Sequence, residues 1–583
     1  MYVGVDVGGT FTDIAINFGD GENVKFYKLP SSPKSPENAI VLGLTEIFKS
    51  YNILPERIVR MSHGTTVGTN ALIEKKSGKV ALVTTKGFRD LLELGRQTRP
   101  TVYDMHKDHP TPIVDRALRF EINQRTLSDG KTKSKLKEEE IKKLAKKIRK
   151  LPIDCVVICY LHSYAFPSDE EKTAKILKTL LPEKVKVLTS SSVYPEFREY
   201  ERASTTTLAA YVQPVVAGYI NRFSEELARR GFQGKFSIMQ SNGGRMPAAA
   251  ITKNAITALF SGPAAGVVGA IRGKGSTPYT DIITLDMGGT STDVALVSND
   301  QAELTPMTMI DGLPVKTPVV DIVTVGAGGG SIAWVDDGGL LRVGPQSAGA
   351  IPGPACYGRG GKLPTVTDAH LVRGTLQADS FLGGKMSVDL AAASHVIGEI
   401  AKKFNVELAE MADSIIRVAE ANIVRAIQQV STERGSDPRE FALVPYGGAG
   451  PLHAARVAED LNIGVDIITD ILHLDELEVR GIGGRGEFLR GLRRKGGVVN
   501  LGHYQAGGIS DRSHQEMGGD RATPGRQPPA ITRPGGNGGG SIAVNGTGHL
   551  IVHSSLLTKN AAAYAGGSIY SKNAASYAGG SIY

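Results

Sequence analysis

The stretch of sequence that decides the fold occurs twice, as GVDVGGTFTDIAI at residues 4–16 and as TLDMGGTSTDVALV at residues 284–297. In each copy an apolar run ends in an aspartate and leads into Gly-Gly-Thr. A second apolar run follows, and it opens with a threonine and a second aspartate. This pattern predicts a strand, a tight turn and a second strand. Two copies in one chain predict two related α/β units, each with a turn that faces phosphate.

The residue types in this motif suit phosphate and magnesium chemistry. The two glycines let backbone N–H groups approach an anion without an intervening Cβ atom. The threonine hydroxyls can donate hydrogen bonds to phosphate oxygens. The aspartates that end the first strands, Asp6 and Asp286, can hold the waters around Mg²⁺, which prefers carboxylate, water and phosphate oxygens. The alternative is a pair of unrelated β-hairpins, which the shared carboxylate pattern disfavours.

A third glycine-rich segment follows another strand-like run, at residues 444–454, VPYGGAGPLHA. We predict a helix that begins near Pro451, with the preceding glycines lying against a nucleoside at the helix N-terminus. Elsewhere, strand-like runs alternate with helical periodicity, which is clearest at residues 411–434. The pattern predicts an α/β protein.

The bulk composition excludes several classes of protein. The 583 residues are 41% hydrophobic and carry a net charge of +8, without an arginine-rich arm, so we expect neither disorder throughout nor a nucleic-acid partner. Three cysteines indicate a reducing compartment. The first residues lack the pattern of a signal peptide, and no apolar run reaches about 20 residues. We therefore expect a cytoplasmic protein that does not bind a membrane.

Glycine is abundant, at 70 residues, and divides into two populations. One population lies in the motifs above. The other lies in residues 465–583, where the end of the chain repeats NAAAYAGGSIY, at 560–570, as NAASYAGGSIY, at 573–583. We interpret this Gly-rich tail as a flexible segment, with a short β-repeat or an interaction tag as the alternative.

The three glycine segments, in this order, resemble the phosphate-1, phosphate-2 and adenosine motifs of the actin, sugar-kinase and heat-shock ATPase superfamily. More narrowly, residues 1–464 resemble the hydantoinase A / 5-oxoprolinase family. The segments that carry the narrower resemblance are residues 5–13, 63–74 (HGTTVGTNALIE), 87–90 (GFRD), 241–244 (SNGG), 261–266 (SGPAAG), 285–293, 325–331 (VGAGGGS) and 446–454.

The resemblance implies a two-lobed, actin-like ATPase fold with the nucleotide between the lobes. It implies an enzyme that uses ATP and Mg²⁺ to phosphorylate the oxygen of a cyclic amide, such as 5-oxoproline or a hydantoin, before hydrolysis. A hydantoinase B-type partner subunit, and therefore a hetero-oligomer, is also implied. Relatives that carboxylate acetone or acetophenone make a ketone carboxylase subunit the second interpretation. A third is an ATP-regulated assembly or chaperone-like module.

The resemblance also implies a set of site residues. The catalytic candidates are Asp6, Asp13, Asp286 and Asp293, of which Asp6 and Asp286 would hold Mg²⁺ through water. The residues expected to bind the nucleotide are Gly8, Gly9, Thr10, Thr12, Gly288, Gly289, Thr290, Gly328, Gly329, Gly447, Gly448 and Gly450. His63, Thr65 and Thr66 are substrate candidates, with a helix cap and a satisfied core histidine as the alternative.

Two further segments have plainer interpretations. We expect Asp368 to be a helix N-cap rather than a metal ligand with His370. We expect the charge-dense segment Glu196–Arg202 to be a salt-bridged surface rather than a substrate clamp.

The resemblance fades after residue 464, where the family continues into a further C-terminal domain. Part of the tail is faintly similar to the glycine-rich end of hydantoinase B. We therefore predict a hydantoinase A N-terminal-type domain at residues 1–190, a hydantoinase/oxoprolinase domain at 191–464 and the tail at 465–583.

Overall fold

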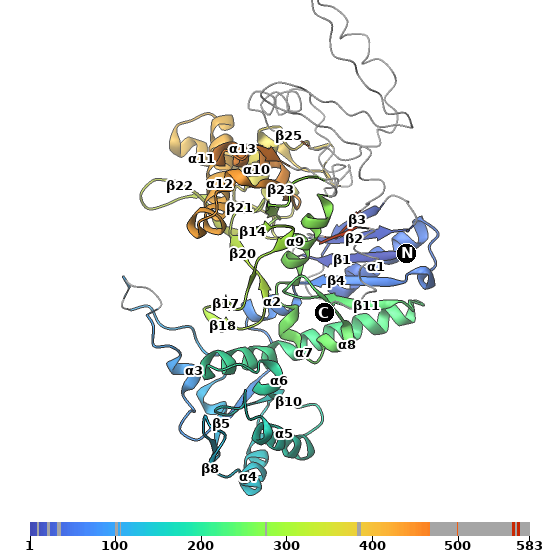
Figure 1. The fold of residues 1–583 in the computed structure, drawn as a ribbon. Coiled ribbons are helices and arrows are strands. Elements are labelled where there is room, and N and C mark those ends of the chain that lie inside the picture. The colour runs from blue at the N-terminus through green and yellow to red at the C-terminus, as the bar shows by residue number, and fades with distance from the viewer. Residues whose placement is uncertain are drawn as a thin grey trace, which may run out of the picture.

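The computed structural model describes residues 1–466 except 9–10, 20–23, 32–35, 100–102, 105, 275–276, 380 and 382–385, together with strand residues 498–499, 562–565 and 568–571. The fold is a mixed α/β fold, as expected, and most of it is organised around three sheets (Figure 1). Both copies of the repeated motif form antiparallel hairpins, one in each of the two larger sheets.

The first sheet holds the first hairpin and has the strand order β12-β11-β4-β1-β2-β3. Its strands are β1 (Tyr2–Val7), β2 (Phe11–Asn17), β3 (Lys25–Pro30), β4 (Arg60–Thr65), β11 (Lys235–Met239) and β12 (Arg245–Pro247). The helices of this part are α1 (Pro36–Ser50), α2 (Val67–Ile73), α7 (Glu199–Arg229), α8 (Ala248–Ile251) and α9 (Ser261–Gly273). Apolar residues of β1, β2 and α1 form its core with Phe223 and Leu227 of α7.

An inserted sheet, with the order β10-β9-β5-β6, lies between α2 and α7 in the chain. Its strands are β5 (Val80–Thr85), β6 (Arg119–Ile122), β9 (Cys155–Cys159) and β10 (Lys186–Thr189). The hairpin β7 (Arg125–Thr126) and β8 (Thr132–Ser134) and the helices α3 (Leu91–Leu94), α4 (Glu138–Ile148), α5 (Ser168–Leu180) and α6 (Ser190–Val193) complete this unit. Figure 1 shows it at the lower end of the molecule, beneath α7.

The second sheet holds the second hairpin. Its strands are β13 (Ile282–Met287), β14 (Thr292–Ser298), β15 (Gln301–Ala302), β20 (Ile322–Val325), β23 (Ala442–Tyr446), β24 (Val465–Asp466) and β25 (Val498–Val499). Its helices are α10 (Val366–Val372), α11 (Leu390–Phe404), α12 (Leu408–Val430) and α13 (Gly450–Leu461), which Figure 1 shows gathered at the end of the molecule away from the inserted sheet. The apolar stripe of α12 is buried, which agrees with its periodicity in the sequence.

The remaining strands form small hairpins and bridges. They are β16 (Leu304–Thr305), β17 (Thr308–Ile310), β18 (Leu313–Val315), β19 (Val319–Val320), β21 (Ser331–Val335), β22 (Leu341–Ser347), β26 (Ala562–Ala565) and β27 (Ser568–Ser571). The last two form a hairpin within the first copy of the tail repeat. The rest of the predicted tail lies outside the described residues.

The first sheet is assembled from distant parts of the chain. Strands β11 and β12 come after residue 190, yet they pair with each other, and β11 pairs with β4 beside β1. The predicted division at residues 190/191 therefore does not separate one sheet from another. The inserted sheet, rather than the N-terminal sheet, ends near that point.

The segment Glu196–Arg202 differs from the expected salt-bridged surface. Arg202, near the start of α7, is fully buried and donates hydrogen bonds to the carbonyls of Tyr160 and Glu196 and to Ser190 Oγ. The expectation of a charged surface is wrong for Arg202, because its guanidinium instead satisfies carbonyl groups inside the protein. Glu201 is salt-bridged as expected, since its carboxylate forms a bidentate ion pair with the half-exposed Arg96, but it is itself buried rather than part of the surface.

Candidate functional site

The two hairpins place their aspartates in identical positions. Asp6 on β1 is opposite Asp13 on β2, and Asp286 on β13 is opposite Asp293 on β14. In each hairpin the next pair joins the last residue of the first strand to a threonine at the start of the second strand, Thr12 as the second residue of β2 and Thr292 as the first residue of β14. The same sequence pattern therefore produces the same register twice, with a pair of carboxylates just before each turn.

The carboxylates of the two hairpins lie close enough to interact with one another. Burial raises the pKa of Asp6 well above its usual value, and the charges of Asp13 and Asp286 raise it further. Burial likewise raises the pKa of Asp286, with further contributions from Asp293 and Asp13. Burial raises the pKa of Asp293 to about 6. Four acids from two distant parts of the chain thus lie near one another, Asp6 and Asp13 buried and Asp286 and Asp293 half-buried, and we call them the carboxylate cluster.

Glycines form the walls against which Asp6 and Asp286 lie. A Cβ atom on Gly64 would lie 2.5 Å from Asp6 Oδ1, and one on Gly262, at the start of α9, would lie 3.3 Å from it. A Cβ atom on Gly447 would collide with Asp286 Oδ1. Asp6 Oδ1 itself is buried and accepts no hydrogen bond from the protein. Both aspartates therefore fit only because the neighbouring residues are glycines. In the space beside Gly64, Asp6 Oδ1 remains an acceptor without a hydrogen bond.

The other two aspartates have different partners. Lys28 on β3 is directly opposite Asp13, and its Nζ lies 3.0 Å from Asp13 Oδ1. In the second sheet the corresponding position opposite Asp293, on β20, is Thr324, whose hydroxyl donates a 2.6 Å hydrogen bond to Asp293 Oδ1. Sequence reasoning missed both residues. Lys28 could have been found as the second lysine of the strand-like run Lys25–Pro30, which directly follows the first hairpin.

The predicted phosphate turn of the second hairpin is packed against the glycine nest at residues 326–331. Gly329 N–H donates to the Gly288 carbonyl at 2.9 Å, and Gly330 N–H donates to the Gly289 carbonyl at 2.6 Å. A Cβ atom on Gly328 would lie 2.5 Å from the Thr290 carbonyl carbon, so this approach requires glycine. Gly289 and Thr290 themselves are exposed, as an anion-binding turn requires. The structure thus brings together the two segments that were expected to lie near the nucleotide.

The third glycine segment lies beside Asp286. Gly447 has a left-handed φ of +79°, and Ala449 N–H donates to the Met287 carbonyl at 2.9 Å. Gly450 begins α13 and packs against the backbone of β13. A Cβ atom on Gly448 would meet nothing within 4 Å, so its outer face is open. Gly448, between the buried end of β23 and the buried start of α13, is therefore an exposed stretch of backbone next to the carboxylate cluster.

The first hairpin turn is described only in part, because Gly9 and Thr10 lie outside the described residues. Gly8 precedes that turn, and its carbonyl accepts a 2.8 Å hydrogen bond from Ser31 Oγ. Thr12 is buried, and its hydroxyl lies 3.0 Å from Ser31 Oγ. The threonine is therefore tied to the serine that follows β3, so its side chain shapes the turn.

The three substrate candidates are engaged by the protein itself. His63 is fully buried, with Nδ1 3.1 Å from the Val5 carbonyl and Nε2 2.7 Å from Tyr219 Oη. Burial lowers its pKa to about 4. Thr65 exchanges hydrogen bonds with Ser261, and Thr66 Oγ1 donates to the Val7 carbonyl at 3.1 Å. This geometry favours the alternative of a satisfied core histidine. Thr66 stands at the N-cap position of α2, but its side chain makes no capping hydrogen bond.

Asp368 is not the N-cap that the sequence suggested. Thr365 is the N-cap of α10, and Asp368 is the third residue of the helix in a capping box with it. The Asp368 carboxylate also accepts hydrogen bonds from the backbone N–H groups of Ala355 and Cys356. The expectation that it does not bind a metal with His370 stays a prediction, and His370 Nε2 lies 3.1 Å from His453 Nε2.

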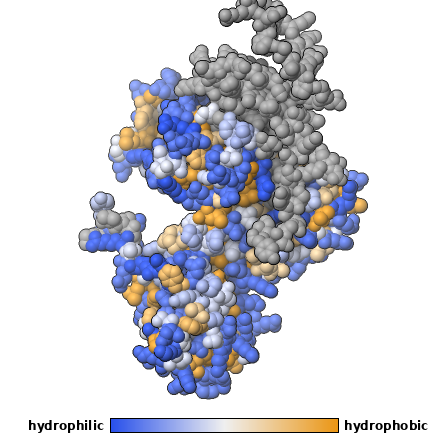
Figure 2. Space-filling model, viewed as in Figure 1, coloured by the Kyte–Doolittle hydropathy of each residue, from blue (hydrophilic) through white to orange (hydrophobic). Residues whose placement is uncertain are grey.

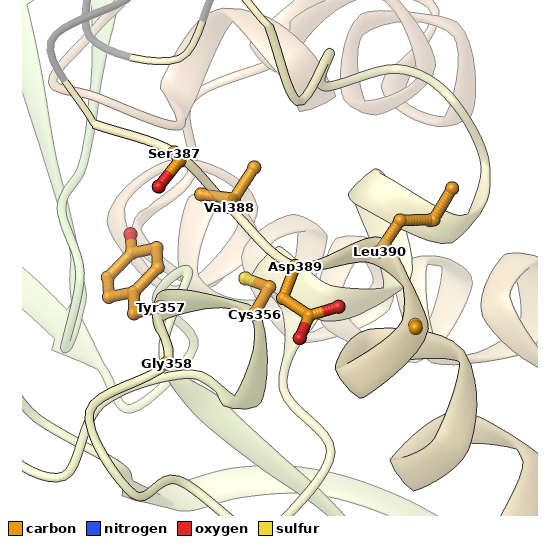
Figure 3. Close-up of a pocket in the computed structure, with 8 residues that line it drawn as sticks. Cys356, Tyr357, Gly358, Ser387, Val388, Asp389 and Leu390 are labelled. Carbon is orange, nitrogen blue, oxygen red and sulfur yellow. The ribbon is translucent and has the colours of Figure 1, made fainter.

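A separate hollow lies beside this capping box, between Tyr357 and the start of α11 (Figure 3). Its thiol, Cys356, is buried, and burial raises the pKa of that thiol far above its usual value. Asp389, at its rim, caps α11 by accepting a hydrogen bond from Ala392 N–H. A protonated thiol and a helix cap are structural groups, so the carboxylate cluster is the better candidate for chemistry.

Comparison with known families agrees with the motifs. A family model described as hydantoinase/oxoprolinase matches residues 202–471, and one for the hydantoinase/oxoprolinase N-terminal region matches residues 2–181. The chain belongs to the hydantoinase/oxoprolinase family. The two matches together contain all four acids of the carboxylate cluster.

Named relatives within the hydantoinase/oxoprolinase family span most of this chain. The caprolactamase subunit alpha of Pseudomonas jessenii is 38% identical over 476 residues, which are 80% of this chain and 68% of the relative. The 5-oxoprolinase 1 of Arabidopsis thaliana is 32% identical over 514 residues, which are 79% of this chain but only 39% of that protein. The family-like part of this chain therefore corresponds to a portion of larger enzymes.

Two solved structures share the fold. The ATP-dependent caprolactamase from Pseudomonas jessenii superimposes with a TM-score of 0.71 at 36% identity, covering 80% of this chain and 68% of that chain. A nucleotide-free acetone carboxylase, described as carrying out ATP-dependent acetone carboxylation, gives 0.69 at 26% identity, covering 79% and 67%. Structures similar to this chain thus include an ATP-dependent caprolactamase and a protein that carboxylates acetone.

The described residues contain neither a membrane-spanning helix nor a direct metal-ligand cluster. None of the helices placed in the structure is long and apolar enough to cross a membrane. Within the same part of the chain, no three His, Cys, Asp or Glu side chains are grouped so that they could hold a metal ion directly. Figure 2 shows hydrophilic and hydrophobic side chains interspersed over the visible face.

Proposed function

We propose that this protein is the ATP-binding subunit of an enzyme that opens a cyclic amide by phosphorylating the amide oxygen. The observation that carries the proposal is the carboxylate cluster, in which aspartates from two hairpins meet beside glycine-lined backbone. Phosphoryl transfer needs little covalent chemistry from the protein and depends on positioning and charge neutralisation. A cluster of acids beside open backbone N–H groups suits that task.

In this proposal the nucleotide lies between the two larger sheets, in a two-lobed, actin-like arrangement. The exposed turn at Gly289 and Thr290 and the turn of the first hairpin would hold phosphates. The open face of Gly448, between β23 and α13, would lie against the nucleoside. The glycine nest at Gly328 and Gly329 would act indirectly, because its contacts shape the second phosphate turn.

The residues present fit Mg²⁺ as the accompanying ion. Asp6 Oδ1 is a buried acceptor without a partner, and it lies in a space that a Cβ on Gly64 would fill. Asp6 and Asp286 would hold the ion through water, since Mg²⁺ keeps several waters and is bound by few carboxylates together with substrate phosphates. The ion would supply charge neutralisation for the transferring phosphate.

The chemistry of the substrate explains why ATP is needed. A cyclic amide is a poor electrophile, because its nitrogen donates electrons to the carbonyl carbon. Attack of the amide oxygen on the terminal phosphorus breaks the bond to the bridging oxygen and releases ADP. Water can then add to the activated carbon, and the C–N bond breaks as the leaving nitrogen takes up a proton. A second water hydrolyses the acyl phosphate that remains, which releases phosphate and leaves the carboxylate of the opened ring. Asp293, with a pKa of about 6, is mostly ionised at neutral pH and is our candidate to accept the proton of that water.

We further propose that the enzyme is complete only with a hydantoinase B-type partner subunit. The relative with 38% identity is named as an alpha subunit, and this chain spans about two thirds of it. The predicted divisions at residues 190/191 and 464/465 stay part of this proposal.

The second candidate function is that of a nucleotide-binding subunit of a ketone carboxylase. It is favoured by the structural likeness to the acetone carboxylase. In that case the activated group would be a ketone-derived oxygen or bicarbonate rather than an amide. The same carboxylate cluster would serve, so the site alone does not separate the two functions.

The test is phosphate release from ATP by the purified chain, alone and with a B-type partner. We expect 5-oxoproline, a hydantoin or caprolactam to stimulate release, with a linear amide of equal size as the control. Stimulation only by a ketone with bicarbonate would replace the proposal with the carboxylase. Stimulation only by a protein client would favour the chaperone-like module.

A further inference from the structure

The two hairpins of the carboxylate cluster are alike, but the residues that face their second aspartates differ, because one is a lysine and the other a threonine. In the first sheet, β3 pairs with β2 and places Lys28 opposite Asp13. In the second sheet, β20 pairs with β14 in the same way and places Thr324 opposite Asp293. A neutral hydroxyl thus suffices to hold one of these aspartates, while the other has an ammonium group.

The ammonium of Lys28 acts beyond its ion pair. The side chain is only 14% exposed, and its Nζ lies 3.0 Å from Asp13 Oδ1. Across the first sheet, Lys28 on β3 pairs with Asp13 on β2, which in turn pairs with Asp6 on β1, so the three charged residues form one row. Lys28 therefore lies at the edge of the carboxylate cluster, beside the first hairpin turn, which would hold phosphate if the proposed function is correct.

We propose that Lys28 binds the terminal phosphate of ATP and carries its charge during transfer. This inference rests on the proposed function and adds a residue to its site. A lysine ammonium is a compact charge with three donors on a flexible stem, so it can keep Asp13 and still donate to a phosphate oxygen. This role explains why the second sheet has Thr324 at the equivalent position, because ATP has one terminal phosphate and needs one such lysine.

The proposal predicts discrimination between nucleotides that differ by the terminal phosphate. Binding of ADP and of adenylyl imidodiphosphate, a non-hydrolysable ATP analogue, is measured by calorimetry in the presence of Mg²⁺. In Lys28→Met we expect the affinity for the analogue to fall about 10- to 100-fold, as for loss of a charge-assisted hydrogen bond, and that for ADP to fall less than about threefold. Lys28→Arg should keep most of the affinity for the analogue, and Thr324→Val should not discriminate between the nucleotides.

A purely structural role for Lys28 makes the opposite predictions. If Lys28 only neutralises Asp13, the double variant Asp13→Asn with Lys28→Met should recover the affinity for the analogue, and that recovery would overturn the proposal. Equal losses for ADP and the analogue would overturn it as well. Failure of the wild-type protein to bind either nucleotide would instead refute the proposed function.

A measurement on the wild-type protein avoids any variant that fails to fold. Reductive methylation of lysines, followed by mass spectrometry, reports the accessibility of each amine. We expect the analogue to protect Lys28 more strongly than ADP does, with exposed Lys76 as the internal reference. Equal protection by the two nucleotides would refute contact with the terminal phosphate.

Discussion

The buried histidine of the His-Gly-Thr-Thr segment makes the protein sensitive to acid. His63 is fully buried, and burial lowers its pKa from 6.5 to about 4. The unfolded chain therefore takes up a proton between those values that the folded chain does not. The stability that neutral His63 contributes is fully present above pH 6.5 and is lost as the pH falls to 4. A shift of this size corresponds to about 3 kcal/mol.

The perturbation that tests this account is His63→Gln. Glutamine cannot be protonated, and its amide can reach only one of the two partners, the Val5 carbonyl and the Tyr219 hydroxyl. At pH 7.5 we expect the variant to be less stable by about 1–3 kcal/mol, because a buried polar group loses its hydrogen bond. Between pH 7.5 and 4.5 the wild type should lose about 2–3 kcal/mol more than the variant does.

Urea unfolding followed by tryptophan fluorescence and circular dichroism, at both pH values and without nucleotide, measures the difference. The matched control is His395→Gln, since His395 is exposed on α11. An identical pH dependence in the wild type and in His63→Gln would refute the reasoning. If His63→Gln instead kept its stability and raised the KM for the amide, the substrate role expected from the sequence would hold.

Two further predictions concern the aspartates and their glycine walls. Asp6→Ala should lower ATP turnover at least about 10³-fold without unfolding the chain, as phosphate release and circular dichroism together would show; near-normal turnover contradicts its assignment to Mg²⁺. Gly447→Ala should lower stability by about 1–3 kcal/mol, because alanine at a φ of +79° is strained and its Cβ meets Asp286. Gly448→Ala is the matched control, since its Cβ meets no protein atom. It should unfold like the wild type, and an equal loss in both variants would mean that the Asp286 contact is unimportant.

The parts of the fold that the sequence predicts well are those set by local pattern. The two hairpins form at the positions of the repeated motif, and α12 forms where the apolar periodicity lies. Helix α13 begins at Gly450, one residue before the predicted start. Each of these features depends on neighbouring residues alone, so one stretch of sequence is enough to specify it.

The features that the sequence did not predict depend on partners far away in the chain. Arg202 reads as part of a charged surface segment, yet it is buried because the Tyr160 carbonyl, from the inserted sheet, accepts its hydrogen bond. From the sequence alone Lys28 is an ordinary lysine in a strand, because nothing near it in the chain indicates that it faces Asp13 across the sheet. The pattern of charges near a residue in the sequence does not report which groups will face it across a sheet.

The two sheets resemble each other beyond the repeated hairpin, in a strand and helix whose sequences are not alike. In the first sheet, β4 runs parallel to β1 and is followed by α2, which begins at Val67, three residues after Gly64. In the second, β23 runs parallel to β13 and is followed by α13, which begins at Gly450, three residues after Gly447.

Both of these glycines lie against an aspartate of the carboxylate cluster, although their paired registers differ by one residue. The surrounding sequences, His-Gly-Thr-Thr and Tyr-Gly-Gly-Ala, share only the glycine, because space for the aspartate is the single requirement common to both. Beyond it the two segments diverge in structure. Thr65 is closed off by Ser261, whereas Gly448 is open. Of the two otherwise equivalent strand ends, the one on the second sheet therefore has the exposed glycine, which is why our proposal places the nucleoside there.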